Sequence, residues 1–218
     1  MTYFDAETFA FLRELKRHND REWFTANKER YERSLKEPIL QFISDVGPEL
    51  RKVSRHLVAD PRPVGGSMFR IYRDVRFSKD KSPYKTHLGA HFPLGGGMGG
   101  PGYYLHVEPG SCFVAGGMWM PEPATLQSIR ERIAERPSDW TKARGKLDPA
   151  EDALKRPPRG FDADDPMIDD IKRKSFTASA PLTDQQMQRS DLVKTFVRGC
   201  EKISPLMRFL AGATGASW

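Results

Sequence analysis

Cysteine is scarce in this sequence, with only Cys112 and Cys200 among 218 residues. Two cysteines are too few for the disulfide framework of a small secreted domain, and they suit a reducing compartment. No run of roughly 18 apolar residues marks a membrane-spanning helix. Acids at Asp5 and Glu7 occupy the region where a signal or transit peptide has basic and apolar segments. We therefore expect a cytoplasmic protein that does not associate with membranes.

Several motifs of nucleotide and metal chemistry are also missing. The glycine run 95–100 lacks the Gly-Lys-Ser/Thr of a P-loop and the setting of a dinucleotide fingerprint. Neither an HExxH motif nor a metal-binding cysteine pair occurs. Ser67 and Ser111 lack the context of a hydrolase nucleophile, and Cys112 sits in an apolar pattern typical of burial. The sequence therefore predicts no cofactor and no metal.

The composition is nevertheless that of a folded protein. Thirteen Phe, six Tyr and four Trp supply bulky core material, and the length suits one domain over 1–218. The net charge of +6 is uneven, because the segment 148–170 carries eight Asp or Glu against three Lys or Arg. The positive excess lies in the middle of the chain, where an anionic partner is most easily attracted.

Hydrophobic spacing predicts three successive regions. Apolar side chains recur at helical spacing over 5–55, which predicts a layer of two or three amphipathic helices. Over 67–119 the period shortens to two, with short Gly- and Pro-containing connections, so we expect an antiparallel meander of about four strands. The region 123–212 predicts further helices and loops. The expected fold class is α+β, with helical regions before and after the strand region along the chain.

The first expected strand covers 68–77, and the glycine run 95–100 is expected to connect two later strands as a hairpin. Arg73 falls on the apolar side of the first strand, so its guanidinium requires an acidic partner or several carbonyls. Alternation also gives the sheet one polar face. The side chains expected there are Arg70, Tyr72, Asp74, Arg76, His87, His91, Tyr104, His106 and Glu108.

Charge is densest between Arg70 and His87, where six Lys or Arg accompany only two Asp. Arginine offers a planar fork and lysine a point charge, both suited to phosphate or carboxylate. Surface ion pairs alone do not explain this segment, because two acids cannot neutralise six cations. We expect a basic pocket for a small anionic ligand, contacted by Arg70, Tyr72, Arg73, Arg76, Lys79, Lys81, Tyr84 and Lys85.

Two other functions fit the same residues. An enzyme could use that pocket with Asp74 and His106, or Tyr104, as proton-transfer groups, because histidine titrates near neutrality. A nucleic-acid-binding module could combine the cations with stacking on aromatic side chains. This second alternative has weaker support, because the chain shows no RNA-recognition, zinc-finger or helix-turn-helix signature. The oligomeric state is open.

His87, His91, His106 and Glu108 carry metal-binding atoms on the expected polar face, but their spacing argues against a shared metal ion. On one strand His87 and His91 lie roughly 13 Å apart at ~3.3 Å per residue, which is too far to share an ion. The expectation of no metal depends on this distance along the strand.

Several blocks of the sequence resemble one known family. They are the run FRIYRDVRFSKDKSPYK at 69–85, together with NDREWF at 19–24, GYYLH at 102–106, GGMW at 116–119 and PRGF at 158–161. The chain is identified on these blocks as a member of the family called domain of unknown function 2461, found in bacteria and fungi. The resemblance spans nearly the whole chain and implies a stand-alone domain with helices flanking a sheet. It carries over no activity, substrate or cofactor.

Overall fold

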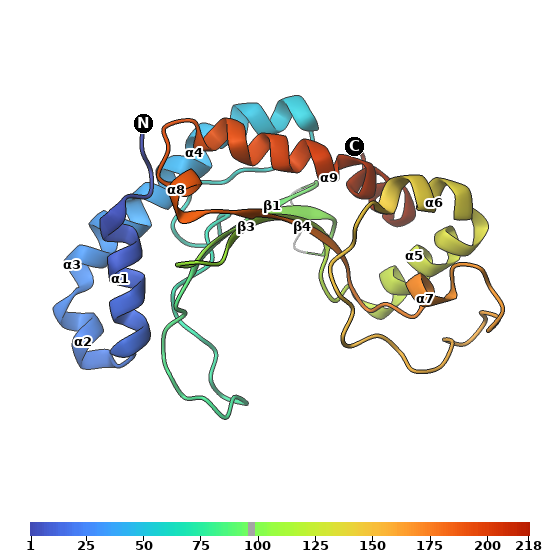
Figure 1. The fold of residues 1–218 in the computed structure, drawn as a ribbon, viewed down its shortest axis with the longest axis horizontal. Helices are drawn as coiled ribbons and strands as arrows, with labels where there is room; N and C mark the ends of the chain where they lie inside the picture. Colours follow the sequence, from blue (N-terminus) through green and yellow to red (C-terminus); the bar gives the residue numbers. More distant parts are fainter. Residues whose placement is uncertain (96–98) are drawn as a thin grey trace.

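The computed structural model describes residues 1–95 and 99–218. Residues 96–98, part of the predicted glycine-rich hairpin connection, lie outside the described residues. The main elements form an arch in which one face of a sheet is covered by helices and the other face is open (Figure 1). No described helix combines the length and the apolar composition needed to cross a membrane.

The N-terminal region is helical, as predicted for 5–55. Asp5 caps the first helix by accepting from the Thr8 amide, and Asp20 caps the second by accepting from the Trp23 amide. The chain then runs through a π-helical turn, Glu32–Lys36, into a long amphipathic helix. The helices here are α1 (Ala6–Arg17), α2 (Arg21–Ala26), α3 (Lys28–Tyr31) and α4 (Glu37–Val53).

The sheet has four antiparallel strands in the order β1-β2-β3-β4. The strands are β1 (Leu88–Pro93), β2 (Gly102–Val107), β3 (Cys112–Met118) and β4 (Phe176–Leu182). The predicted α+β class and the antiparallel meander are therefore confirmed, and three of these strands lie inside the predicted region 67–119.

The predicted first strand at 68–77 is wrong. At the start of this segment Met68 forms an isolated bridge with Ala90, and the Phe69 amide donates a hydrogen bond to the Gly89 carbonyl. Residues 69–87, which we call the basic loop, otherwise touch the sheet through side chains such as Phe69 and His87. Beyond that point the basic loop pairs with itself, through the Arg73 amide and the Pro83 carbonyl at 2.9 Å. The alternation of apolar and polar side chains over 68–77 therefore does not correspond to a strand of the sheet.

The fourth strand instead comes from Phe176–Leu182, inside the region predicted to hold only helices and loops. The remaining elements are helical and lie largely where expected. They are α5 (Pro123–Glu135), α6 (Pro137–Arg144), α7 (Ile168–Ile171), α8 (Asp184–Met187) and α9 (Leu192–Thr214). Helix α9 continues through Pro205 without a break.

The covered face of the sheet packs against α9 and α4 (Figure 1). Phe196 of α9 meets Phe42 of α4 and Phe92 of β1 with ring centroids 5.5 Å and 5.3 Å apart. Gly199 lets α9 approach β3, because a side chain there would press on Val114 at 3.2 Å. This apolar layer holds the strands in place and leaves their other face free.

Candidate ligand site on the open face of the sheet

The open face of the sheet carries the side chains that alternate with the apolar layer. His91, Tyr104, His106 and Phe113 lie on this face, as the alternation of β1 and β2 predicted for the first three. Two glycines give these rings room: a Cβ at Gly89 would overlap the Tyr104 hydroxyl, and one at Gly102 would overlap His91. The rings therefore lie over neighbouring strands.

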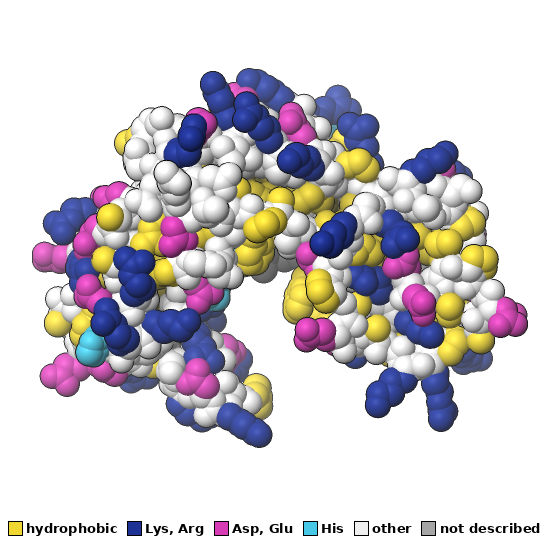
Figure 2. All heavy atoms as spheres, viewed as in Figure 1, with side chains coloured by type: hydrophobic (Ala, Val, Ile, Leu, Met, Phe, Trp, Pro, Cys, Tyr) yellow, Lys and Arg dark blue, Asp and Glu magenta, His cyan; other side chains and the backbone are white. Residues whose placement is uncertain are grey.

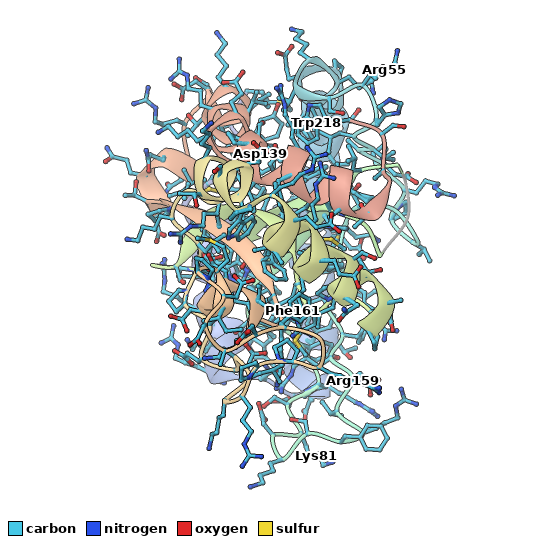
Figure 3. The ribbon with its side chains drawn as sticks, turned by 90° about the vertical axis from the view of Figure 1, so that its right-hand side faces the viewer. Arg55, Lys81, Asp139, Arg159, Phe161 and Trp218 are labelled. Atoms are coloured by element: carbon cyan, nitrogen blue, oxygen red, sulfur yellow. The ribbon has the colours of Figure 1, made fainter. Side chains whose placement is uncertain are left out.

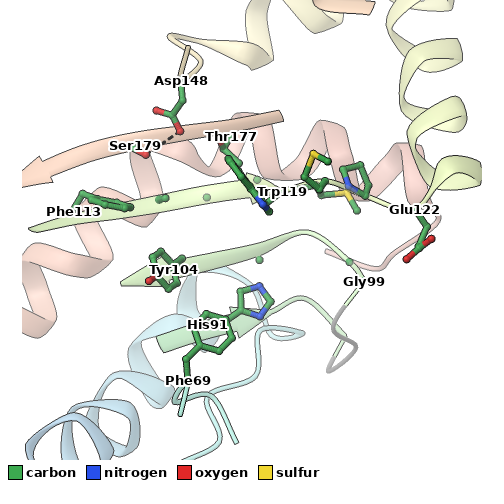
Figure 4. Close-up of a pocket in the computed structure, with 18 residues that line it drawn as sticks. Phe69, His91, Gly99, Tyr104, Phe113, Trp119, Glu122, Asp148, Thr177 and Ser179 are labelled. Atoms are coloured by element: carbon green, nitrogen blue, oxygen red, sulfur yellow. Dashed lines mark hydrogen bonds between the residues drawn. The ribbon is translucent and has the colours of Figure 1, made fainter. Parts of the chain in front are cut away.

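A cavity of about 590 Å³ lies on the open face, and Figure 4 shows its lining. Its aromatic wall comes from four elements of the chain: Phe69 in the basic loop, Tyr104 on β2, Phe113 on β3 and Trp119 just after β3. In the space-filling view the molecule is hollowed beneath the sheet, between the N-terminal side and the α5–α7 side (Figure 2). Lys81 and Arg159, from these two sides, lie at the same end of the molecule (Figure 3).

The cavity also has a polar end. The Ser179 hydroxyl of β4 donates to Asp148 at 2.9 Å, and the Asp148 amide donates to the Thr177 carbonyl at 2.8 Å. These bonds fix a carboxylate beside the sheet, which can accept hydrogen bonds from a ligand. Trp119 stands at the rim with 78 % of its surface exposed.

A hydrogen-bonded chain runs from the cavity wall toward α1. The Tyr104 hydroxyl lies 3.0 Å from His106 Nδ1, and His106 Nε2 lies 3.3 Å from a Glu108 oxygen. Phe113 stacks on the His106 ring with centroids 4.6 Å apart. His87 packs on the other side of the cluster, with its ring centroid 4.4 Å from that of His106.

Burial controls the protonation of these groups. It lowers the pKa of His87 to about 4, helped by the nearby His106 and opposed by Glu108. Burial also lowers the pKa values of His91 and His106, although Glu108 partly offsets the effect at His106. Burial raises the pKa of Tyr104 to about 12. The neutral imidazoles and the neutral phenol are therefore favoured near pH 7.

The predicted acidic partner of Arg73 is present: its guanidinium pairs with Asp80. Arg76 pairs with Asp74 in the same way, at 2.7 Å, and this bond lowers the pKa of the Asp74 carboxyl. Lys81 donates to the Val75 carbonyl at 3.0 Å. Two of the six predicted cations, Arg73 and Arg76, are thus paired with acids within the basic loop.

The other four cations, Arg70, Lys79, Lys81 and Lys85, have no carboxylate partner among the described residues. The Lys85 ammonium donates to the Arg70 carbonyl at 2.9 Å and lies 5.4 Å from the centre of the Phe69 ring. Phe69 lines the cavity, and Lys85 contacts this ring without being a lining residue itself. Burial and the charge of Arg70 both lower the pKa of Lys85.

The two predicted tyrosines of the basic loop anchor it to the N-terminal helices. Tyr84 is buried and stacks on Phe24 with centroids 4.0 Å apart, while its backbone exchanges two hydrogen bonds with Asn19. Tyr72 packs beside Tyr84 at 5.4 Å but is half exposed. Tyr84 therefore positions the loop, and Tyr72 remains accessible to a ligand.

The structure brings together two of the three predicted proton-transfer candidates. Tyr104 and His106 are hydrogen-bonded, whereas the hydrogen bonds of Asp74 go to Arg76. Several lining residues were not singled out from the sequence, notably Phe69, Phe113, Asp148 and Ser179. Phe113 carried a usable signal, because it alternates with the buried Cys112 and Val114. Asp148 and Ser179 carried none, because they reach the site through the missed strand β4.

The comparisons with known proteins place the chain in a family. A family model described as a conserved hypothetical protein, DUF2461, matches residues 7–209, and the chain belongs to that family. This confirms the resemblance seen in the sequence blocks. No curated protein and no solved structure shows a significant match.

Proposed function

We propose that this protein binds a small organic molecule that carries a phosphate or carboxylate, with Lys85 and Arg70 holding the anion. The observation that supports this most is the position of Lys85, which lies beside Arg70 and over the ring of Phe69, a residue that lines the open-face cavity. Arg73 and Arg76 of the basic loop are less suited to this role, because each is already paired with an acid.

The electrostatic reason is the juxtaposition of two like charges without a carboxylate between them, among the described residues. Their mutual repulsion and the partial loss of water around Lys85 both disfavour the charged lysine. An anion placed between the two side chains relieves both costs. It also gains charge-assisted hydrogen bonds from the guanidinium fork and from the free ammonium protons.

The rest of the cavity indicates the body of the ligand. Aromatic rings dominate its wall, so a flat, partly apolar group would be well accommodated. At the far end, Asp148 would accept hydrogen bonds from a donor group on the ligand. A larger ligand that reaches along the basic loop would make secondary contacts with Tyr72, Lys79 and Lys81.

The test is a thermal-shift and calorimetric screen of phosphorylated metabolites, aromatic carboxylates and short oligonucleotides at two salt concentrations. A ligand at 100 times its Kd raises the free energy of unfolding by about 2.7 kcal/mol. We expect a small anionic compound to bind, and Lys85→Ala or Arg70→Ala to weaken it about tenfold, or about 1.4 kcal/mol.

Arg76→Ala is the matched control, because Arg76 belongs to the same loop but is exposed and paired with Asp74. Equal losses from Arg76→Ala and Lys85→Ala would contradict the proposal, as would the absence of any small-molecule binder. Binding only of oligonucleotides, with a steep loss at high salt, would favour the nucleic-acid alternative instead.

An enzyme remains a second candidate because of the Tyr104–His106–Glu108 hydrogen-bonded chain beside the cavity. In such an enzyme the phenol would exchange a proton with a bound substrate, and His106 would orient it. Tyr104→Phe would then abolish turnover of the identified ligand and leave its Kd within about threefold. Unchanged turnover in Tyr104→Phe would exclude this role.

We further propose a cytoplasmic location. The support is that Cys112 and Cys200 are both buried and unpaired, as a reducing compartment allows. Labelling of the protein in fractionated cells is the direct test.

A further inference from the structure

Three side chains with metal-binding atoms meet at the β1 and β2 ends nearest α1. His87 immediately precedes β1, His106 lies on β2, and Glu108 immediately follows β2. One ligand atom from each lies within 4.8 Å of the others. They are neighbours because Leu88 pairs with Val107, so that His87 and Glu108 extend the same antiparallel register.

We propose that His87, His106 and Glu108 bind a divalent first-row transition ion, with Zn²⁺ as the best match. Two imidazole nitrogens and one carboxylate oxygen form a donor set that such ions prefer. The ligands of this site are different residues from those proposed to hold the anion, although Lys85 lies only two residues before His87.

The spacing of the ligand atoms is close to what a metal requires. Zinc with ligands at about 2.0–2.1 Å holds tetrahedral ligand atoms roughly 3.3 Å apart. His106 Nε2 and the Glu108 oxygen are already 3.3 Å apart. All three ligand atoms lie within 4.8 Å of one another, so His87 needs to approach by at most roughly 1.5 Å.

The surroundings orient His106 for this role. A zinc-binding histidine usually donates its second ring N–H to a fixed acceptor, which sets the tautomer and the ring direction. His106 Nδ1 lies 3.0 Å from the Tyr104 hydroxyl, so Nε2 faces Glu108 and the proposed ion. Stacking of Phe113 on the imidazole, with planes 11° apart, restricts the ring further.

Two lysines place positive charge near the site: Lys85 acts on His87, and Lys16 acts on Glu108. Lys16 on α1 approaches Glu108 at 3.6 Å, but its side chain is 69 % exposed, so the ammonium can move into solvent. Three protein ligands leave at least one coordination position for water, as in catalytic zinc sites. Because Tyr104 and Phe113 touch His106 and line the cavity, a bound ion would lie beside the cavity.

The test uses the full chain, without an affinity tag, after treatment with a chelator. Co²⁺ is titrated while its visible d–d absorption is followed, and Zn²⁺ is titrated in competition with a chromophoric chelator. We expect one equivalent to bind. His87→Ala and Glu108→Gln should each weaken Zn²⁺ binding at least tenfold, and His106→Ala should do the same if it folds.

Two matched variants complete the design. His91→Ala removes a histidine of the same sheet face, and His18→Ala removes an exposed one; neither should change the Zn²⁺ affinity. Circular dichroism verifies that Glu108→Gln and His87→Ala are folded. Binding well below one equivalent overturns the proposal. Equal losses from His91→Ala or His18→Ala and from His87→Ala overturn it as well.

Discussion

The two faces of the sheet are built from the same strands but have different chemistry. On β2, Tyr103 points into the layer under α9 and bonds to Ser204 at 2.9 Å. The next residue, Tyr104, points to the open face and bonds to His106 at 3.0 Å. Successive side chains on a strand therefore contribute in turn to the packed core and to the candidate binding face, because one face packs against helices and the other does not.

The difference also explains where exposed aromatic residues occur. Side chains on the covered face are among the most buried in the chain, including Phe92, Tyr103 and Phe196. Around the open face, Trp119 and Tyr72 are exposed, and so is Phe77 at 96 %. Of these three, Trp119 lines the cavity, and a large apolar side chain exposed at a cavity is typical of a binding site.

The largest expected effect is on the covered face. Phe196→Ala removes a fully buried ring between Phe42 and Phe92 and should lower the free energy of unfolding by about 3–5 kcal/mol. Phe113→Ala on the open face should cost much less, because that ring is only partly buried. Urea denaturation of both variants measures the difference. Equal costs would mean that the two faces do not divide their roles.

Thiol labelling provides the next test, because both cysteines belong to the covered side. Burial raises the pKa of Cys112 to about 11, so at pH 8 its reactive thiolate should be roughly a hundredfold scarcer than in a free cysteine. Burial raises the pKa of Cys200 as well. Iodoacetamide labelling at pH 8 should be slow in the native protein and fast in urea. Rapid native labelling of Cys112 would show that the covered face opens near the β2–β3 turn.

The adjacent tyrosines allow a sharper comparison with a single hydroxyl removed from each. Tyr103→Phe loses a buried hydrogen bond to Ser204 and should lower the free energy of unfolding by about 1 kcal/mol. Tyr104→Phe should change stability less but weaken Zn²⁺ binding about tenfold, because His106 loses its orienting partner. The reverse pattern, with metal affinity sensitive to Tyr103, would contradict the assignment of roles.

The smallest expected effect concerns the exposed lysine beside Glu108. Lys16→Ala removes a cation 3.6 Å from a proposed metal ligand and should tighten Zn²⁺ binding about two- to threefold at low salt. The gain should fade at high salt as the charge is screened. Competition titrations at two ionic strengths measure both values, and Lys52→Ala, paired with Glu49 on α4, is the control. Weaker binding by Lys16→Ala would show that the ammonium supports the site.

Local pattern was enough to predict the three strands whose partners are close in sequence. The alternation over 87–92 and 103–108 placed His91, Tyr104 and His106 on one face, as the register confirms. The sequence pattern did not predict strand β4, because Phe-Thr-Ala-Ser-Ala-Pro-Leu is rich in small residues and contains a proline. Its partner β3 lies nearly 60 residues earlier in the chain, and no local signal records that pairing.

The candidate site was predictable only in part for the same reason. The sequence identified the cations of the basic loop, but not which of them pair internally, since Arg73 meets Asp80 and Arg76 meets Asp74 only after the loop folds back. The distance between His87 and His91 along one strand argued against a metal. The cluster that forms instead joins His87 to His106 across two strands, which depends on the register.

The most direct test of the division between the faces is a map of amide chemical-shift changes in two-dimensional NMR spectra. The labelled protein is titrated with the best small anionic ligand from the screen. We predict changes at Phe69, Arg70, Lys85, Tyr104 and Phe113, and none along Leu192–Thr214 beyond those transmitted through β3. Changes concentrated on α9, or spread evenly over the basic exposed surface, would contradict the assignment of the open face as the binding face.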